Sequence, residues 1–311
     1  MFNDLVYPIK IPTPFAVGDV YCYLINDEKK VLVDCGHKAD EAYRLVKSRL
    51  NDLNLVIEDI DEIWLTHGHP DHFGQAARLA KESRAVVYGH QKESANFADY
   101  DNRELFDEFF SEHLIPKEHK DFMIEQLDWL QQYQQPISPE WIEEGTVLNS
   151  GGLSLKVKHT PGHAPGHLAF YADEEVIFGG DNLLEHISTN ALINFDPDTG
   201  ERNQSLLQYR KTLRWIRTLS GLVLPGHGKF ISNIAMIADH HLEEHRRRYL
   251  EIRKLLAQRP YSLYELSLKL FPDAVKDGAI FLVLSEVVGY LDWGIEEGVI
   301  EKNGEMFVSE Q

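Results

Sequence analysis

Residues 65–72, LTHGHPDH, are the stretch that decides the fold of this chain. Three imidazoles and one carboxylate fall within six positions: His67, His69, Asp71 and His72. An apolar run typical of a strand (60–66) precedes the ligands and a helical pattern (75–83) follows them, which places the ligands in a strand-to-helix turn. Imidazole and carboxylate are the ligands that zinc, iron and manganese share. The stretch therefore predicts a metal site.

Three further candidate ligands stand just beyond apolar strand-like runs. His163 and His227 each follow a Pro-Gly pair, and Asp181 follows a run that ends in two glycines. In layered folds of helices and sheets, sites form where strands end. A structural zinc ion usually takes four closed ligands, often cysteines. Here the ligands are too many for one closed site and include no cysteine, so the set favours a catalytic site for two metal ions.

Residues 67–72 match the pattern H-x-H-x-D-H letter for letter, and through it the chain resembles the metallo-β-lactamase superfamily. Asp34 in the segment LVDCG, His163, Asp181 and His227 follow in the order that the family has, so the resemblance spans roughly residues 18–232. It implies an α+β fold, a four-layer αβ/βα sandwich. Its specificity is high for fold and metal and low for substrate, because one fold hosts many chemistries.

The resemblance also assigns the ligands to two metal sites. The first site takes His67, His69 and His163, and the second takes Asp71, His72 and His227. Asp181 bridges both ions together with a water or hydroxide, and Asp34 orients a ligand. The cofactors implied are two divalent metal ions, with zinc expected and iron or manganese as alternatives.

The function expected from the resemblance is metal-dependent hydrolysis by a metal-bridged hydroxide. Asp71 is the candidate catalytic residue, because it can orient the nucleophile and shuttle its proton besides binding metal. Similarity to glyoxalase II-type members favours a small thioester or ester as substrate. His186 and Asn190, which follow Asp181, are weaker candidates for the substrate pocket.

Other functions stay open at this point. The C-terminal part resembles the winged-helix tail of the β-lactamase-like endoribonuclease subgroup, which would indicate a ribonuclease or phosphodiesterase. A mononuclear iron persulfide oxygenase uses a similar histidine motif and would leave the second ligand set empty. Outside enzymes, a metal-binding scaffold or a winged-helix regulator is the remaining alternative.

The chain divides into two expected domains. Residues 1–232 would form the metallo-β-lactamase-fold domain, with an acidic, aromatic and helical insert at about 91–135. The aromatic stripes of this insert favour helix–helix packing over a substrate lid. Residues 233–311 would form a helical, winged-helix-like domain that ends in a pair of strands. Further strands are expected at 19–25, 30–34, 85–88, 153–157, 168–171, 176–178 and 222–224, and helices at 40–53 and 206–219.

One motif is interpreted as a false lead. Residues 241–245 match H-x-x-E-H, a zinc-peptidase pattern. Their neighbours are Glu243, Arg246, Arg247 and Arg248, so we interpret the segment as a solvated helix face.

The composition of the chain limits the kinds of partner that the protein is expected to bind. Thirty-one Lys and Arg stand against fifty Asp and Glu, a net charge of −19, and such a surface repels nucleic acids and anionic membranes. We therefore expect a small-molecule substrate, no membrane or nucleic-acid partner, and a packing or dimerising role for the C-terminal domain. The two cysteines cannot build a disulfide scaffold. No signal peptide or long apolar run is recognisable, so a cytoplasmic protein is expected.

Overall fold

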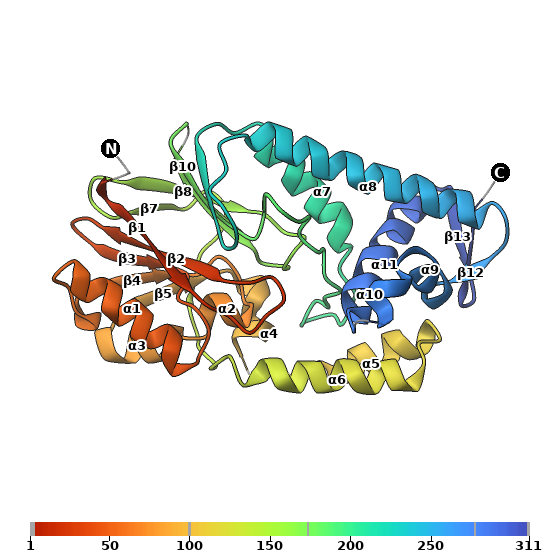
Figure 1. Cartoon of the computed structure of the whole chain (residues 1–311), viewed down its shortest axis with the longest axis horizontal. Helices are drawn as coiled ribbons and strands as arrows, with labels where there is room; N and C mark the ends of the chain where they lie inside the picture. Colours follow the sequence, from red (N-terminus) through yellow and green to blue (C-terminus); the bar gives the residue numbers. More distant parts are fainter. Residues whose placement is uncertain (1–3, 99–100, 173, 277, 310–311) are drawn as a thin grey trace.

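A computed structural model describes residues 4–98, 101–172, 174–276 and 278–309 of the chain (Figure 1). Two larger sheets and one small sheet make up its strands. The six strands of the first sheet, in spatial as well as chain order, are β1 (Val6–Ile11), β2 (Val20–Asn26), β3 (Lys30–Val33), β4 (Glu62–Trp64), β5 (Val86–Gly89) and β6 (Glu140–Trp141).

The first sheet changes from antiparallel to parallel at β3. Strands β1 to β3 pair as antiparallel hairpins, and β3, β4, β5 and β6 are parallel. Parallel strands end at the same edge, so the segments that follow β3 and β4 lie side by side there. Asp34 directly follows β3, and the histidine-rich loop follows β4 through Leu65 and Thr66. The sheet therefore brings these two segments together.

The second sheet is built from the following half of the chain. Its spatial order is β11 (Leu222–Pro225), β10 (Val176–Gly180), β9 (Leu168–Ala172), β8 (Ser154–His159) and β7 (Val147–Asn149). Only β10 and β11 are parallel. Asp181 and His227 follow these two parallel strands, so they too leave the sheet at a shared edge.

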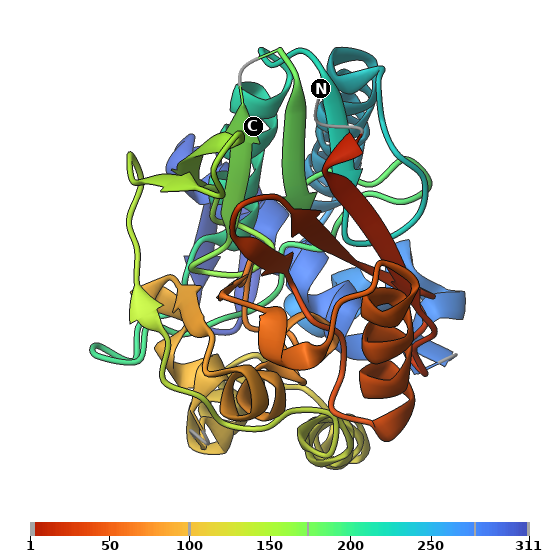
Figure 2. The ribbon, with the colours of Figure 1, turned by 90° about the vertical axis from the view of Figure 1, so that its left-hand side faces the viewer.

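Packing of the two sheets gives the four layers expected. One hydrophobic cluster contains residues of both sheets, among them Trp64 and Phe178. A second cluster joins the first sheet to α1 (Asp40–Asp52) and α3 (Ala76–Ser83), and a third joins the second sheet to α7 (Ser205–Ile216) and α8 (Ile234–Leu256). In Figure 2 the orange helices and the blue-green α7 and α8 lie on opposite sides of the strands.

The periodicity of α1 shows why the sequence predicts these layers. Ala42, Val46 and Leu50 recur every four residues and are fully buried, as one face of a helix of 3.6 residues per turn must be when it covers a sheet. The same amphipathic logic applies to α7, whose Leu206, Tyr209 and Leu213 enter the third cluster.

The C-terminal part is helical with a small sheet, as predicted. After α8 come α9 (Leu263–Leu270), α10 (Pro272–Lys276) and α11 (Ile280–Glu296), and the sheet has the order β12 (Tyr261–Ser262), β14 (Met306–Ser309), β13 (Ile300–Asn303). The boundary near residue 232 stays a prediction, because a single cluster joins α11 to α7 and the second sheet. No helix in the described part of the chain is both long and apolar enough to cross a membrane.

The insert packs against this C-terminal part. It contains η3 (Gln91–Glu93), α4 (Ser94–Phe97), α5 (Arg103–Glu112) and α6 (Lys117–Gln131). Helices α5 and α6 run along the side of the molecule opposite α8 (Figure 1). Phe106, Phe109 and Phe110 of α5 are buried in the cluster that holds α11. These aromatic side chains therefore pack between helices.

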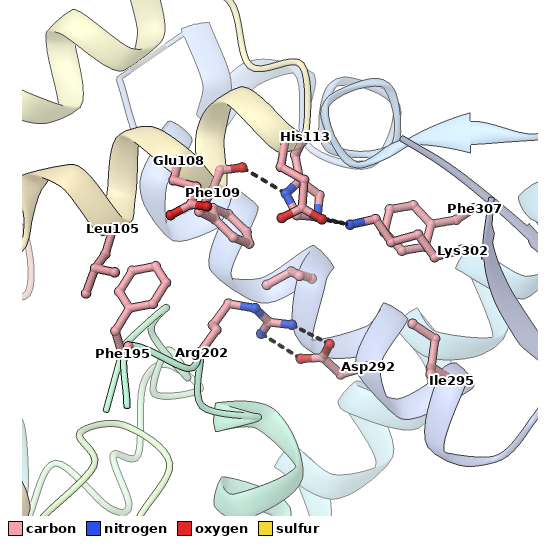
Figure 3. Close-up of a pocket in the computed structure, with 13 residues that line it drawn as sticks. Leu105, Glu108, Phe109, His113, Phe195, Arg202, Asp292, Ile295, Lys302 and Phe307 are labelled. Carbon is pink, nitrogen blue, oxygen red and sulfur yellow. Dashed lines mark hydrogen bonds and ion pairs between the residues drawn. The ribbon is translucent and has the colours of Figure 1, made fainter. Parts of the chain in front are cut away.

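A cavity of about 320 Å³ lies at this junction, lined by α5, α11, β13 and the loop around Arg202 (Figure 3). The Arg202 guanidinium forms two hydrogen bonds, of 2.8 and 2.6 Å, with Asp292, and Lys302 pairs with Glu112. The main charges of the cavity are thus already paired with one another. None of the candidate metal ligands lines it.

Strand β1 was not among the strands expected from the sequence. It contains Pro8 and lies at the edge of the sheet, where a residue without an N–H is tolerated. One sequence expectation is wrong. The helix face at 241–245 was expected to be solvated, yet His241 and His245 are each only 4% exposed. The charged residues next to the motif suggested an exposed segment, but the helix face that carries His241 and His245 packs on the main body of the protein.

Short helical turns complete the fold. They are η2 (Ile57–Asp59) and α2 (Pro70–Phe73). In α2, His69 is the residue before the first turn and Pro70 opens it, where the fixed backbone of proline suits a helix start.

Candidate metal centre

The predicted ligands come from four loops at the edges of the two large sheets. The loop between β4 and α3 carries His67, His69, Asp71 and His72. His163 lies between β8 and β9, and Asp181 and His227 follow β10 and β11. The structure brings all seven side chains together, and six of them are buried, the exception being the half-buried His69.

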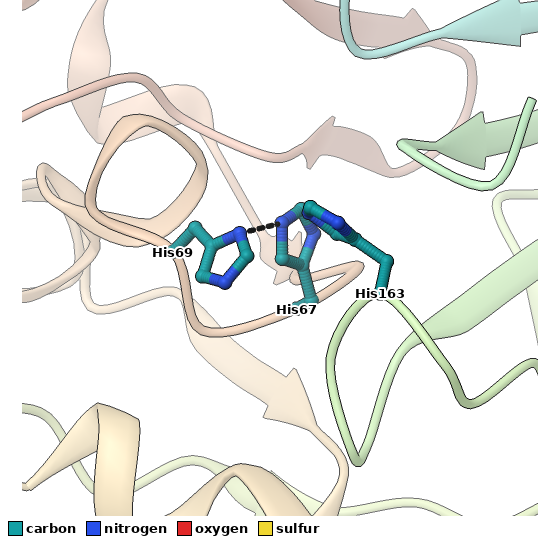
Figure 4. Close-up of side chains that lie close together, drawn as sticks. All are labelled: His67, His69 and His163. Atoms are coloured by element: carbon teal, nitrogen blue, oxygen red, sulfur yellow. Dashed lines mark hydrogen bonds between the residues drawn. The ribbon is translucent and has the colours of Figure 1, made fainter. Parts of the chain in front are cut away.

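The first group of ligands combines both sheets. The nearest ring nitrogens of His67, His69 and His163 lie within 4.8 Å of one another (Figure 4). The His67 Nε2 and His69 Nδ1 atoms are 2.9 Å apart. Burial, which penalises the charged form, lowers the pKa of His67 well below its usual range and that of His69 to about 3. Both rings are therefore neutral, the form in which imidazole binds a metal ion.

The second group surrounds Asp71. Ligand atoms of Asp71, His72 and His227 also lie within 4.8 Å of one another, with His227 Nε2 3.3 Å from Asp71 Oδ2. Between the groups, Asp181 Oδ1 is 3.5 Å from His72 Nε2, and its Oδ2 is 3.5 Å from His163 Nε2 and 3.6 Å from His227 Nε2. Asp181 thus contacts members of both groups.

These separations fit two ligands of one ion better than direct hydrogen bonds. Two ligand atoms each about 2.0–2.1 Å from a tetrahedral zinc ion are roughly 3.4 Å apart, whereas a good N–H to oxygen bond is about 2.9 Å long. Among the described residues, four buried atoms at this centre lack a hydrogen-bond partner: His72 Nε2, His163 Nε2, His227 Nε2 and Asp181 Oδ1. Buried polar atoms are rarely left unpaired. The residues present therefore fit divalent metal ions.

The rings of His72, His163 and His227 are each oriented by a hydrogen bond at Nδ1, the ring nitrogen that points away from the centre. His72 Nδ1 is 2.8 Å from Asp34 Oδ2, His163 Nδ1 is 2.9 Å from the Asn190 carbonyl, and His227 Nδ1 is 2.8 Å from the Asp19 carbonyl. Because Nδ1 donates to these acceptors, Nε2 is the ring atom that faces the centre. The neighbouring carboxylates, Asp181 first, raise the pKa of His72 and His227 against the effect of burial, so an ion that binds these two rings must displace a proton.

Charges at the centre favour the ionised carboxylates. Burial raises the pKa of Asp181, but His227 and His72 outweigh burial and hold it well below the usual range. The pKa of Asp71 is lowered in the same way, with burial opposing His72 and His227. Both side chains are therefore carboxylates near neutral pH.

Asp34 contacts the Nδ1 side of the His72 ring, away from the Nε2 atom that faces the centre. Its Oδ1 accepts the Thr66 N–H at 2.8 Å, and its Oδ2 accepts the Thr66 hydroxyl at 2.8 Å besides the His72 ring. Its backbone has φ of 55°, a conformation that Asp and Asn tolerate better than most residues. This placement suits the orienting role expected for it.

The two weaker pocket candidates lie near the centre in different ways. The exposed His186 packs against the turn after His227, since a Cβ on Gly228 would be 2.8 Å from its ring. Asn190 contributes its backbone carbonyl to His163. Their role toward a substrate stays a prediction.

Two residues that sequence reasoning did not single out support the centre. Glu93 accepts hydrogen bonds from the backbone of both loops that carry the first ligand group. Gly226 packs so closely that a Cβ there would be 2.3 Å from Asp181 Oδ1. Only the Pro-Gly pair before His227 hinted at the glycine, and Glu93 gave no signal in the acidic insert.

The motif at 241–245 supports the loop that follows Asp181. His241 Nε2 is 3.0 Å from the Leu184 carbonyl, and His245 Nε2 is 3.1 Å from the Ser188 hydroxyl. These two histidines hold a loop and form none of the candidate metal groups among the described residues.

The chain is similar in sequence and structure to known metallo-β-lactamase-fold proteins. A family model described as "Metallo-beta-lactamase superfamily" matches residues 16–227. The probable metallo-hydrolase YqjP of Bacillus subtilis is 29% identical over 303 residues, covering 94% of this chain and 92% of that protein. The hydroxyacylglutathione hydrolase GloC of Haemophilus influenzae is 30% identical, covering 55% and 70%. A metallo-beta-lactamase family protein from Thermus thermophilus superposes with a TM-score of 0.84, 27% identity and 99% coverage of both chains.

Proposed function

The chain belongs to the metallo-β-lactamase superfamily, and we propose that it is a binuclear metal-dependent hydrolase of small thioesters or esters. One observation carries the proposal. Three buried, unpartnered ring nitrogens, the Nε2 atoms of His72, His163 and His227, surround the carboxylate of Asp181. These rings belong to two different ligand groups, which favours two ions over one.

The chain itself would organise the reaction. Two divalent ions held by these residues would supply Lewis acidity and would lower the pKa of a water molecule to about 7. Asp34, Asn190 and Asp19 fix the three rings with Nε2 toward the centre. The Asp71 carboxylate, held ionised by His72 and His227, orients the attacking water and accepts its proton.

Zinc is the proposed metal. The donor set is mainly imidazole with carboxylates and without thiolates, which suits zinc, iron and manganese. The spacing of about 3.4 Å expected for tetrahedral zinc ligands agrees with the separations of 3.5 to 3.6 Å around Asp181 and of 3.3 Å between His227 and Asp71.

The substrate class rests on relatives and chemistry together. The relative from Haemophilus influenzae is named a hydroxyacylglutathione hydrolase, and an acylglutathione is a thioester. A thiolate is a good leaving group that a metal ion can stabilise, so thioesters suit this type of centre. The net charge of −19 makes a long polyanion a poor substrate by comparison.

The test is metal analysis of the purified full chain followed by a substrate panel. The panel holds an acylglutathione, an acyl-coenzyme A, an aryl ester, a lactone and a phosphodiester. We expect two zinc ions per chain, turnover of a thioester or ester, and loss of that turnover in Asp71→Asn.

Other outcomes would overturn the proposal. Turnover of the phosphodiester alone would indicate a nuclease-type activity. A single iron ion with oxygen uptake on a persulfide would indicate an oxygenase. Unchanged hydrolysis in Asp71→Asn would remove Asp71 from the reaction.

A further inference from the structure

Glu93 is a fully buried carboxylate at the end of η3, in the helical insert. Its Oε2 accepts the Gly68 N–H at 3.0 Å and the Asn96 side-chain amide at 2.7 Å, and its Oε1 accepts the Gly166 N–H at 2.5 Å. Burying a carboxylate is costly unless hydrogen bonds replace its water. Three donors do so here and oppose the rise in the pKa of the Glu93 carboxyl that burial causes, and they hold this side chain in one defined position.

The two backbone donors belong to the two loops of the first ligand group. Gly68 stands between His67 and His69 on the loop after β4, and Gly166 stands three residues after His163 on the loop between β8 and β9. These loops belong to different sheets, which share no strand pairing among the described residues. One backbone hydrogen bond, from the Leu168 N–H to the Thr66 carbonyl at 2.7 Å, joins them close to the two glycines. The Glu93 carboxylate joins them through one side chain.

The packing around Glu93 leaves little room for adjustment. A Cβ on Gly68 would be 2.6 Å from Glu93 Oε2, and a Cβ on Gly166 would be 2.8 Å from Glu93 Cγ. Both distances are below ordinary van der Waals contact, so the glycines allow the loops to approach the carboxylate. The loops and the carboxylate therefore form one tightly fitted unit.

We infer that Glu93 is a positioning residue that sets the spacing of His67, His69 and His163 and thereby the affinity of the first metal ion. The inference rests on the two-ion site of the proposed function. Among the described residues, the hydrogen bonds of Glu93 go to Gly68, Asn96 and Gly166 and to none of the candidate ligand side chains. Glu93 therefore acts through the backbone beside the ligands.

Residues other than Glu93 orient the ligands of the second group, so the inference predicts an effect on one ion only. His72 is oriented by Asp34, and His227 by the Asp19 carbonyl. Neither support contacts Glu93 among the described hydrogen bonds. Loss of the Glu93 carboxylate should therefore weaken the first ion and spare the second.

The test variant is Glu93→Gln. Glutamine has nearly the same shape, but its amide turns an NH₂ donor toward a backbone N–H that needs an acceptor. Zinc is titrated into metal-free full-length protein in competition with a chromophoric chelator. We expect one of two zinc ions to bind about 10- to 100-fold more weakly, the range for loss of a group that orients ligands.

Two further variants separate positioning from general damage. Glu62→Gln is the matched control, because Glu62 is also buried and accepts the Trp64 indole N–H on β4, away from the ligand loops. It should leave both zinc affinities unchanged. Asn96→Ala removes one of the three donors to Glu93 and should give a smaller loss at the same ion, which keeps the inference testable if Glu93→Gln folds poorly.

A double-mutant cycle assigns the affected ion. In a His227→Ala background, which lacks a ligand of the second group, adding Glu93→Gln should weaken the remaining zinc ion. In a His69→Ala background it should change nothing further. Equal effects in both backgrounds, or none in either, would overturn the inference. The readout is zinc affinity and does not depend on the substrate. If the wild-type protein binds zinc but hydrolyses no thioester or ester, the proposed substrate is refuted, and the zinc titrations still test the role of Glu93.

Discussion

Replacing Asp34 by Asn should remove metal binding by one ligand while leaving the fold in place. The backbone N–H of Thr66 needs an acceptor, so the Asn oxygen should stay where Oδ1 now accepts it at 2.8 Å. The new NH₂ then takes the place of Oδ2 and faces the His72 Nδ1 atom, 2.8 Å away. It donates to that nitrogen, so the ring proton moves to Nε2, where the ion should bind.

The expected magnitude follows from the bond that is lost. A hydrogen bond to a charged group contributes about 1.5–3 kcal/mol, which corresponds to about 10- to 100-fold in affinity at about 1.4 kcal/mol per tenfold. Asn tolerates the left-handed backbone of residue 34, where φ is 55°. No added backbone strain should therefore obscure the effect.

The assay is zinc competition with a chelator, with hydrolysis measured at rising zinc concentration. Hydrolysis should return as zinc saturates the weakened site. The control is Asp27→Asn: Asp27 also accepts several hydrogen bonds, from Ser150 and the backbone of residues 152 and 153, but it lies at the other end of β3. Zinc affinity of Asp34→Asn within about twofold of wild type would refute this reasoning about the tautomer.

Three other predictions address the centre and its support. Gly226→Ala places a Cβ 2.3 Å from Asp181 Oδ1 and should abolish zinc binding; full occupancy in metal analysis would contradict this. Burial lowers the pKa of His245 to about 3, so the unfolded chain binds more protons below pH 6.5 and stability should fall by about 2 kcal/mol between pH 6.5 and 5. Denaturant unfolding of the metal-free protein should show a shallower fall in His245→Gln, and an equal slope would count against the argument. Removing zinc with a chelator should lower stability by about 2.7 kcal/mol if free zinc was at 100 times its dissociation constant; an unchanged melting temperature would argue that no ion binds.

The strand and helix pattern was largely predictable because it depends on local periodicity. The expected helix at 40–53 corresponds to α1 (Asp40–Asp52), and the expected strands at 19–25 and 30–34 correspond to β2 and β3, which pair with each other. Strand β1 was not among the expected strands. It contains Pro8, which an edge strand accepts because the missing N–H faces away from its neighbour.

Burial was harder to predict where charge and packing share a helix. The segment at 241–245 is surrounded by charged residues in the sequence. Yet one face of α8 packs on the main body, and His241 and His245 reach the loop after Asp181 from it. Whether a helix face is buried depends on the segment that packs against it, and a short stretch of sequence does not contain that information.

The sequence by itself determined the chemistry of the candidate centre, because ligand type and spacing within residues 67–72 are local properties, and the motifs around His163, Asp181 and His227 each end a recognisable strand. Only the tertiary structure decided how these loops are held against one another. Glu93, in an insert with no signal of its own, bonds to the backbone of two loops from different sheets. Such a contact joins residues 25 and 73 positions apart in the chain, and hydrogen bonds of that range form only once the sheets have packed.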